Sequence, residues 1–214
     1  MQMNKSLFLL LMSLAMLAGM GALFAIRHTT SSRWASASPE VQAILWPAPR
    51  EIADFTELDQ HGKAFTKDDL KKRWNLLYFG YLQCPDICPT TLQSLSAMRA
   101  SMIENNPLSD VPRIIFVSVD PVNDTPERIT TYLAFFNKEL IGLSGPPDQL
   151  ETLARSLGIV YAENVDADGV RSMEHTTSIL VVDPNGRAVG ALPAPHQGQG
   201  MLRQFNALRA FLEQ

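Results

Sequence analysis

Residues 76–89, with the sequence LLYFGYLQCPDICP, decide the expected fold of this chain. The apolar run 76–81 is typical of a buried strand, and the pattern from Thr91 to about Glu104 predicts a helix. Cys84 and Cys88, the only cysteines, therefore lie in the turn between the two. The positive end of a helix lowers the pKa of a nearby thiol, and thiolate is the form that binds a soft metal or attacks a disulfide.

Strands and helices alternate in the rest of the chain. Residues 113–119 are apolar nearly throughout, as a strand buried on both faces of a parallel sheet should be. Either Asp124 or Thr125 can cap the next helix. Further helices are expected at 147–157 and 199–212, a hairpin at 177–192, and an earlier hairpin that turns at 59–62. This pattern predicts an α/β fold with a mixed central sheet flanked by helices and with an N-terminal β-hairpin.

Composition and charge exclude some functions. The 214 residues carry a formal net charge of −4, whereas nucleic-acid-binding proteins usually show a basic surface, so no nucleic-acid partner is expected. Two cysteines can form one site or one bridge, but they cannot form a disulfide framework. The chemistry is therefore expected at the Cys84–Cys88 pair, at the end of a central strand.

The N-terminus has the character of a membrane segment. Residues 6–26 form an uncharged run of 21 residues between Lys5 and Arg27, close to the roughly 20 residues that cross a bilayer. Its length favours an uncleaved anchor over a removed signal peptide. We expect an anchor at 1–27, a Ser-, Thr-, Ala- and Pro-rich linker at 28–49, and one domain at 50–214. A single N-terminal span most simply exports the domain attached to it, so the expected location is the periplasmic face of a bacterial inner membrane.

The four histidines are the candidates for a third metal ligand. Three of them lie in the linker, a turn and a loop: His28, His61 and His196. His175 directly precedes an apolar strand, where a histidine is more often structural than a ligand. Because the two thiols have no other evident partner in the sequence, a structural role and a ligand role for His175 are about equally favoured. Asp120 and Met173 are interpreted as turn and packing residues.

Further motifs accompany the dithiol in a fixed order. Residues 74–81, WNLLYFGY, lead into 84–92, CPDICPTTL. Residues 117–121, VSVDP, precede 124–126, DTP, and His175-Thr176 is followed by 182–187, VDPNGR. In this order and spacing the motifs closely resemble the Sco/SenC family of copper chaperones for cytochrome c oxidase assembly. Two departures are Gln83, where many members have His, and Glu174, where many have Asp.

The resemblance implies a thioredoxin-like fold with copper held by Cys84, Cys88 and His175. It further implies a metallochaperone that delivers copper to the dinuclear site of oxidase subunit II, with a periplasmic copper donor or a thiol reductant as a further partner. Thiolates select Cu(I) and an imidazole also serves Cu(II), so such a site can hold either oxidation state.

Two other functions compete with this interpretation. In a thiol–disulfide oxidoreductase, Cys84 and Cys88 would form a redox-active disulfide and reduce the cysteines of the oxidase copper site. Against a pure reductase, thioredoxin-type enzymes use Cys-x-x-Cys and place a proline near the dithiol, whereas residues 172–179 contain none. A peroxidase with Cys84 as its nucleophile is the least favoured, because no activating Thr/Arg environment is evident locally. Whether the protein is an enzyme stays open at this point.

Overall fold

The computed structural model describes residues 9, 11–21, 34–105 and 111–214. Residues 11–21 are helical, but much of the expected anchor at 1–27 lies outside the described residues. Within these ranges, none of the helices combines the length and the apolar character needed to cross a membrane.

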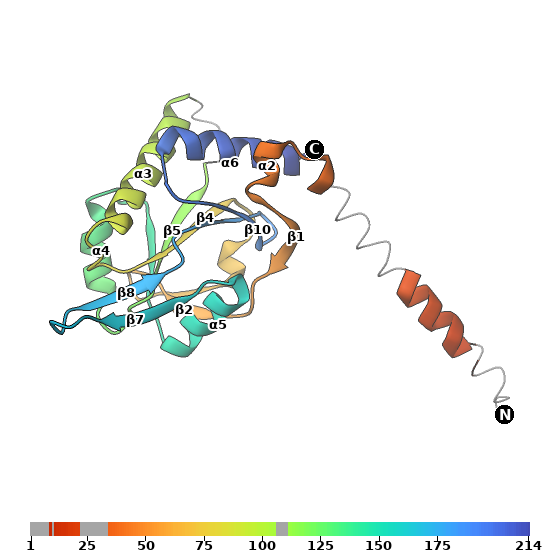
Figure 1. Ribbon diagram of the computed structural model, residues 1–214, viewed down its shortest axis with the longest axis horizontal. Helices are drawn as coiled ribbons and strands as arrows, with labels where there is room; N and C mark the ends of the chain where they lie inside the picture. Colours follow the sequence, from red (N-terminus) through yellow and green to blue (C-terminus); the bar gives the residue numbers. More distant parts are fainter. Residues whose placement is uncertain (1–8, 10, 22–33, 106–110) are drawn as a thin grey trace.

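A six-stranded mixed sheet forms the centre of the domain, in the order β1-β10-β9-β4-β5-β6 (Figure 1). β4 (Asn75–Gly80) pairs in parallel with β5 (Arg113–Ser118), which pairs in parallel with β6 (Ile141–Leu143). On its other side, β4 pairs antiparallel with β9 (Ile179–Val182), which continues to β10 (Arg187–Leu192). Every residue of β4 is buried, as its apolar sequence predicts. The mixed α/β architecture expected from the sequence is confirmed.

Helices cover the sheet and agree largely with the sequence expectations. α3 (Ile87–Asn105) packs against α6 (Gly198–Leu212), while α4 (Pro126–Ala134) lies beside β6. α5 (Pro147–Leu157) ends at Gly158, whose φ of 73° is readily adopted by glycine. A short 3-10 helix spans Lys67–Leu70.

Two helix starts refine the sequence interpretation. α3 begins at Ile87 rather than near Thr91, so that Cys88 lies in its first turn. Thr125 caps α4, since its side chain accepts a hydrogen bond from Arg128 N. Asp124 is instead buried.

The expected linker at 28–49 differs from the structure over its described part. α2 (Pro39–Gln42) and the edge strand β1 (Leu45–Glu51) belong to the domain, and β1 pairs antiparallel with β10. Val41 and Ile44 are 4% and 2% exposed. A boundary at residue 50 is therefore too late. The sequence does not indicate β1 because this strand contains Pro47 and Pro49, which strands tolerate mainly at the edge of a sheet.

Two hairpins lie outside the main sheet. β2 (Thr56–Leu58) and β3 (Ala64–Thr66) confirm the N-terminal hairpin. β7 (Tyr161–Val165) and β8 (Arg171–His175) form a second one, here called the β7–β8 arm, which extends from the lower left of the domain in Figure 1. The apolar residues 159–161 indicate the start of β7, and the composition of 166–169, DADG, indicates its turn, whereas no local pattern indicates β8.

Candidate metal centre

The dithiol lies where β4 passes into α3. Cys84 is in the connecting loop and Cys88 is in the first turn of the helix. The backbone N–H of Cys88 donates to Cys84 Sγ at 3.4 Å. Both cysteines are free thiols, but only Cys84 retains some exposure, at 9% against 0% for Cys88. A reactant from solvent therefore reaches Cys84 first.

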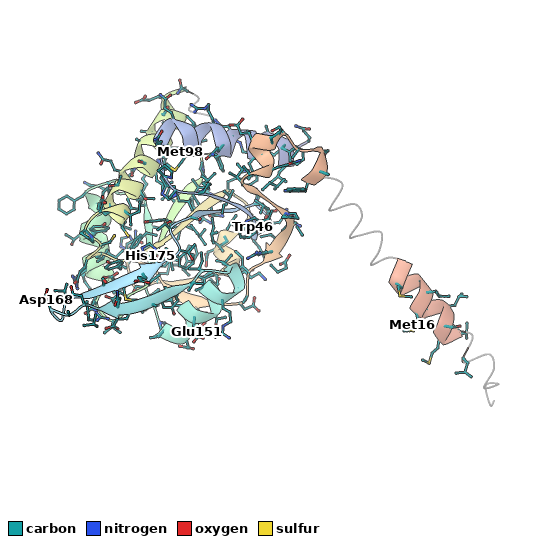
Figure 2. The ribbon with its side chains drawn as sticks, in the orientation of Figure 1. Met16, Trp46, Met98, Glu151, Asp168 and His175 are labelled. Atoms are coloured by element: carbon teal, nitrogen blue, oxygen red, sulfur yellow. The ribbon has the colours of Figure 1, made fainter. Side chains whose placement is uncertain are left out.

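His175, the last residue of β8, meets this dithiol. Its Nε2 lies 3.6 Å from Cys88 Sγ, although 87 residues of chain separate them. Its Nδ1 lies 3.1 Å from the carbonyl oxygen of Thr176. A carbonyl can only accept a hydrogen bond, so Nδ1 carries a proton and Nε2 is the nitrogen that faces the sulfur. Such a partner for the second ring nitrogen is typical of metal-binding histidines. Figure 2 shows His175 at the inner end of the arm and Asp168 at its tip.

The sulfur–nitrogen separation suits one shared metal ion. With bonds of about 2.3 Å to sulfur and about 2.0–2.1 Å to nitrogen at a tetrahedral angle, the two ligand atoms lie about 3.5 Å apart, close to the observed separation. Cys88 Sγ and His175 Nε2 already lie 3.6 Å apart. Among the described residues, however, no three His, Cys, Asp or Glu side chains are arranged around a common point as bound ligands would be. The sulfurs and the imidazole instead hydrogen-bond to one another, so a metal has to displace a proton.

The two thiols have opposite protonation preferences. The pKa of Cys84 is lowered to about 4, chiefly because the Cys88 thiol donates a hydrogen bond to its sulfur. The His175 side chain and the backbone N–H groups of Asp86 and Cys88 act in the same direction, against the opposing effect of burial. The pKa of Cys88 is raised, because its proton is held by that hydrogen bond to Cys84 and because the side chain is buried. At neutral pH the pair is thus one thiolate and one thiol.

Several neighbours of the dithiol were not identified from the sequence. Tyr78 on β4 donates its hydroxyl to Cys88 Sγ at 3.6 Å. The rings of Tyr78 and Tyr81 stand edge-on to the His175 ring, with centroids 6.2 and 6.1 Å apart. Tyr81 directly follows β4 and is three residues from Tyr78, so strand alternation alone would place the two rings on opposite faces. The sequence therefore held no signal that both rings contact His175.

The other histidines do not join the site. His61 is exposed in the β2–β3 turn. His196 is buried, and its Nδ1 lies 2.9 Å from the hydroxyl of Thr91. Burial lowers the pKa of His196, which favours the neutral ring in this structural role. His28 lies outside the described residues.

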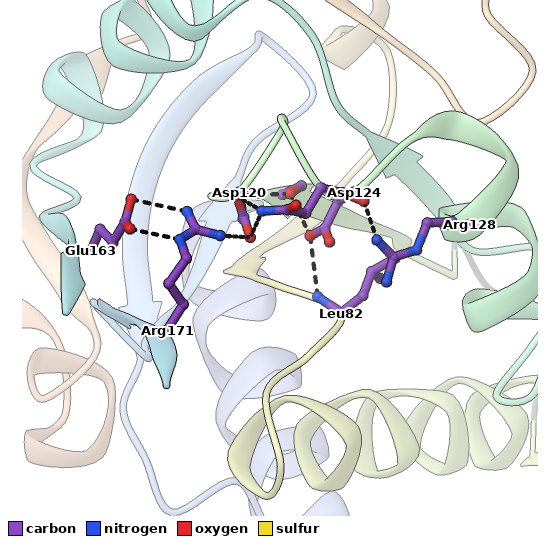
Figure 3. Close-up of polar contacts among 8 residues, drawn as sticks. Leu82, Asp120, Asp124, Arg128, Glu163 and Arg171 are labelled. Atoms are coloured by element: carbon purple, nitrogen blue, oxygen red, sulfur yellow. Dashed lines mark hydrogen bonds and ion pairs between the residues drawn. The ribbon is translucent and has the colours of Figure 1, made fainter. Parts of the chain in front are cut away.

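A polar network connects the loop after β5 to both halves of the site (Figure 3). Asp124 Oδ2 accepts a hydrogen bond at 3.1 Å from the backbone N–H of Leu82, two residues before the first cysteine. Asp120 Oδ2 lies 3.5 Å from Arg171 Nη1, at the start of β8. Arg171 also makes a two-point contact with Glu163 on β7. The interpretation of Asp120 as a turn residue alone is therefore incomplete.

A separate cavity of about 530 Å³ lies away from the dithiol. Its lining includes Trp34, Trp46 and Trp74. Trp74 precedes β4 whereas the cysteines come after it, so the cavity and the dithiol lie at opposite ends of this strand. None of the three expected ligands lines the cavity. Trp34 and Trp46, which fall in the expected linker, are therefore part of the wall of this cavity.

Comparison with known proteins assigns the family. The SCO1/SenC family model matches residues 47–209. The SCO2-like protein RP587 of Rickettsia prowazekii is 32% identical over 190 residues, which cover 87% of this chain and 89% of that protein. The crystal structure of Arabidopsis thaliana ScoI with copper bound has a TM-score of 0.69 at 29% identity and covers 74% of this chain and 98% of its own. That of Bradyrhizobium japonicum ScoI with copper bound has a TM-score of 0.63 at 33% identity, with coverage of 76% and 98%. The fold is thus thioredoxin-like, as expected, and the chain belongs to the SCO1/SenC family.

Proposed function

We propose that this protein is a membrane-anchored copper metallochaperone that binds copper through Cys84, Cys88 and His175. It helps to assemble the dinuclear copper site of cytochrome c oxidase subunit II. The observation that carries the proposal is the 3.6 Å approach of His175 Nε2 to Cys88 Sγ. Members of the Sco family act in cytochrome c oxidase assembly, and two similar structures contain copper.

The donor set suits a cargo that must be released again. Two sulfurs favour Cu(I), and the added imidazole also accommodates Cu(II). Binding needs only one thiol proton to leave, that of Cys88, because Cys84 is already a thiolate at neutral pH. Cys84 and His175 retain access to solvent, so the thiolates of a recipient can approach from that side and exchange for these ligands one at a time.

Location and partners are inferred from the N-terminus and from the dithiol. The uncharged run 6–26 supports a single inner-membrane anchor with the domain in the periplasm. In that oxidising compartment the dithiol has to be kept reduced to accept copper. A thiol reductant, together with a copper donor, is therefore part of the proposal.

A thiol–disulfide oxidoreductase is the second candidate, and the unequal thiols favour it. The Cys84 thiolate would attack a disulfide of subunit II and release one of its sulfurs as thiolate. Cys88, once deprotonated, would then attack Cys84 in the mixed disulfide and release the second target sulfur. The products are a reduced target and a Cys84–Cys88 disulfide, so two electrons pass to the target.

Copper titration of the full-length chain in detergent, reduced and under anaerobic conditions, tests the proposal. The metallochaperone predicts stoichiometric binding that His175→Ala weakens by at least about a hundredfold, more than the loss of an outer partner would. His61→Ala is the matched control, since this histidine is exposed in a turn, and it should bind like the unmodified chain.

Two further outcomes separate the candidates. The oxidised Cys84–Cys88 form should take up no copper until a reductant is added, because a disulfide offers no thiolate. If His175→Ala leaves copper binding intact while Cys84→Ser abolishes reduction of a target disulfide, the metallochaperone proposal fails and the oxidoreductase remains.

A further inference from the structure

We propose that Arg171, through its ion pair with Asp120, is a positioning residue that holds the β7–β8 arm on the domain and thereby keeps the His175 imidazole at the dithiol. As a statement about copper binding, this inference rests on the proposed function. As a statement about where the imidazole lies, it holds for the copper-free protein as well.

Side-chain contacts, and not strand pairing, hold the arm on the domain. β7 and β8 pair only with each other and form a two-stranded sheet separate from the main one. Residues 162–171 are all exposed. A two-stranded hairpin is marginally stable by itself in water. The orientation of this arm therefore depends on the side-chain contacts that its inner face makes with the domain.

One face of β8 carries these contacts. Side chains alternate along a strand, so Arg171, Met173 and His175 point to the same side. Arg171 starts the strand and His175 ends it, about 13 Å apart at about 3.3 Å per residue. In the middle, Met173 lines a small cleft together with Tyr81. A contact between Arg171 and the domain thus fixes the direction of β8, and with it the position of the His175 imidazole.

Asp120 provides a fixed point for that contact. It is 5% exposed, and both of its carboxylate oxygens accept hydrogen bonds from Asn123 Nδ2 at 2.9 Å. Its backbone N–H donates to Ser118 Oγ at 3.0 Å, and that hydroxyl donates to Asp124 Oδ2 at 2.7 Å. Asp124 in turn holds the backbone N–H of Leu82 on the dithiol loop. The loop after β5 therefore contacts the dithiol loop at Leu82 and β8 at Arg171 (Figure 3).

Arg171 makes one ion pair within the arm and one to the domain, and the ion pair to the domain can open. Its Nε and Nη2 bind the two oxygens of Glu163 at 2.6 and 2.9 Å, which leaves Nη1 pointing at Asp120 at 3.5 Å. The pair with Glu163 lies wholly within the arm. The longer contact to Asp120 is the one that joins the arm to the domain. If that contact opens, Arg171 keeps Glu163 as its partner and the arm can carry the imidazole away from a bound metal.

The test uses the full-length reduced chain in detergent and three substitutions. Arg171→Met keeps an unbranched apolar side chain but removes both ion pairs. Arg171→Lys keeps the charge and should rescue part of the effect. Glu163→Gln is the matched control, because it removes charge from the pair within the arm and leaves the contact to Asp120. All three change exposed side chains, so the fold should be retained.

The first readout needs no copper. The NMR nuclear Overhauser effects between the ring protons of His175 and Tyr81, whose ring centroids are 6.1 Å apart, should weaken strongly in Arg171→Met and persist in Glu163→Gln. If the Overhauser effects persist in Arg171→Met, the inference is wrong, regardless of the result of the copper titration. If they are lost while even the unmodified chain binds no copper, the positioning role stands and the proposed function fails.

The second readout is a double-mutant cycle with copper. Arg171→Met should weaken copper binding by up to about fivefold, the upper end of the range for an exposed ion pair. In the His175→Ala background the same substitution should have no further effect, because Arg171 acts only through the imidazole. An equal loss in both backgrounds would mean that the Arg171 charge acts on the thiolates directly, and it would overturn the positioning role.

Discussion

Gly80 lies directly against Cys88, and a Cβ atom at position 80 would stand 2.9 Å from Cys88 Sγ. The same atom would lie 2.9 Å from Cε2 of Phe116 on the neighbouring strand. Real Cβ atoms essentially never approach so closely, so the sulfur can occupy its place at the end of β4 only because residue 80 has no side chain.

Gly80→Ala should therefore displace the sulfur or the Phe116 ring. We expect it to destabilise the fold by about 1–3 kcal/mol, as overpacking does, and to weaken copper binding. Gly200→Ala on α6 is the control, since its nearest neighbouring atom is 4.0 Å from the new Cβ and alanine favours a helix by about 1 kcal/mol over glycine. Denaturant unfolding and copper titration measure both effects. If Gly80→Ala binds copper as tightly as the unmodified chain, the close contact between position 80 and Cys88 is contradicted.

Cys84 should react with an alkylating agent at unusually low pH. Because its pKa is lowered to about 4, the thiolate fraction of the reduced copper-free chain changes little from pH 8 to pH 5 and falls only near pH 4. The iodoacetamide rate should follow this curve, and mass spectrometry should locate the label on Cys84. Cys88→Ala removes the principal hydrogen-bond donor to the Cys84 sulfur and should shift the curve to higher pH. A rate that climbs steeply from pH 7 to 9 would argue against the assigned thiolate.

The buried Glu57 should make stability fall as the pH rises. It is 1% exposed, its Oε1 has no hydrogen-bond partner, and burial, followed by the charge of Asp148, raises its pKa to about 7. Below the ordinary value of 4.5 both the folded and the unfolded states hold the proton. Between 4.5 and 7 only the folded state holds it, so the free energy of unfolding decreases by up to about 3 kcal/mol across this window.

Glu57→Gln should remove this pH dependence, because an amide stays neutral. Its gain in stability over the unmodified chain should therefore be larger at pH 8 than at pH 4.5, as measured by urea unfolding at both values. Glu151→Gln, an exposed substitution on α5, controls for the loss of one negative charge. Parallel stability curves for Glu57→Gln and the unmodified chain would refute the buried-acid explanation.

Shortening the chain should show where the domain begins. Removing residues up to 49 deletes Val41, Ile44 and most of β1, which lie against α6 and β10. Each fully buried aliphatic side chain contributes about 1.5–3 kcal/mol, so a chain of residues 50–214 should unfold at much lower denaturant than residues 34–214. Equal midpoints for the two chains would restore the original boundary at residue 50.

The sequence predicted well those features that depend on neighbouring residues. The apolar run of β4, the helix after it and the cap at α4 are local patterns, and a local pattern carries its own periodicity and capping chemistry. The dithiol was placed correctly at a strand-to-helix turn for the same reason. β1 and β8 were missed because neither shows the apolar or alternating pattern of a strand: β1 is mostly exposed and contains two prolines, and β8 has the sequence RSMEH.

The sequence by itself therefore determined the order of most strands and helices, the place of Cys84 and Cys88, and, through its motifs, the family. Only the tertiary structure decided that His175 reaches the sulfurs and His196 does not, that Gly80 makes room for Cys88, and that Arg171 faces Asp120. These are contacts between segments distant along the chain. They depend on how the sheet and the arm pack together, which no single stretch of residues encodes.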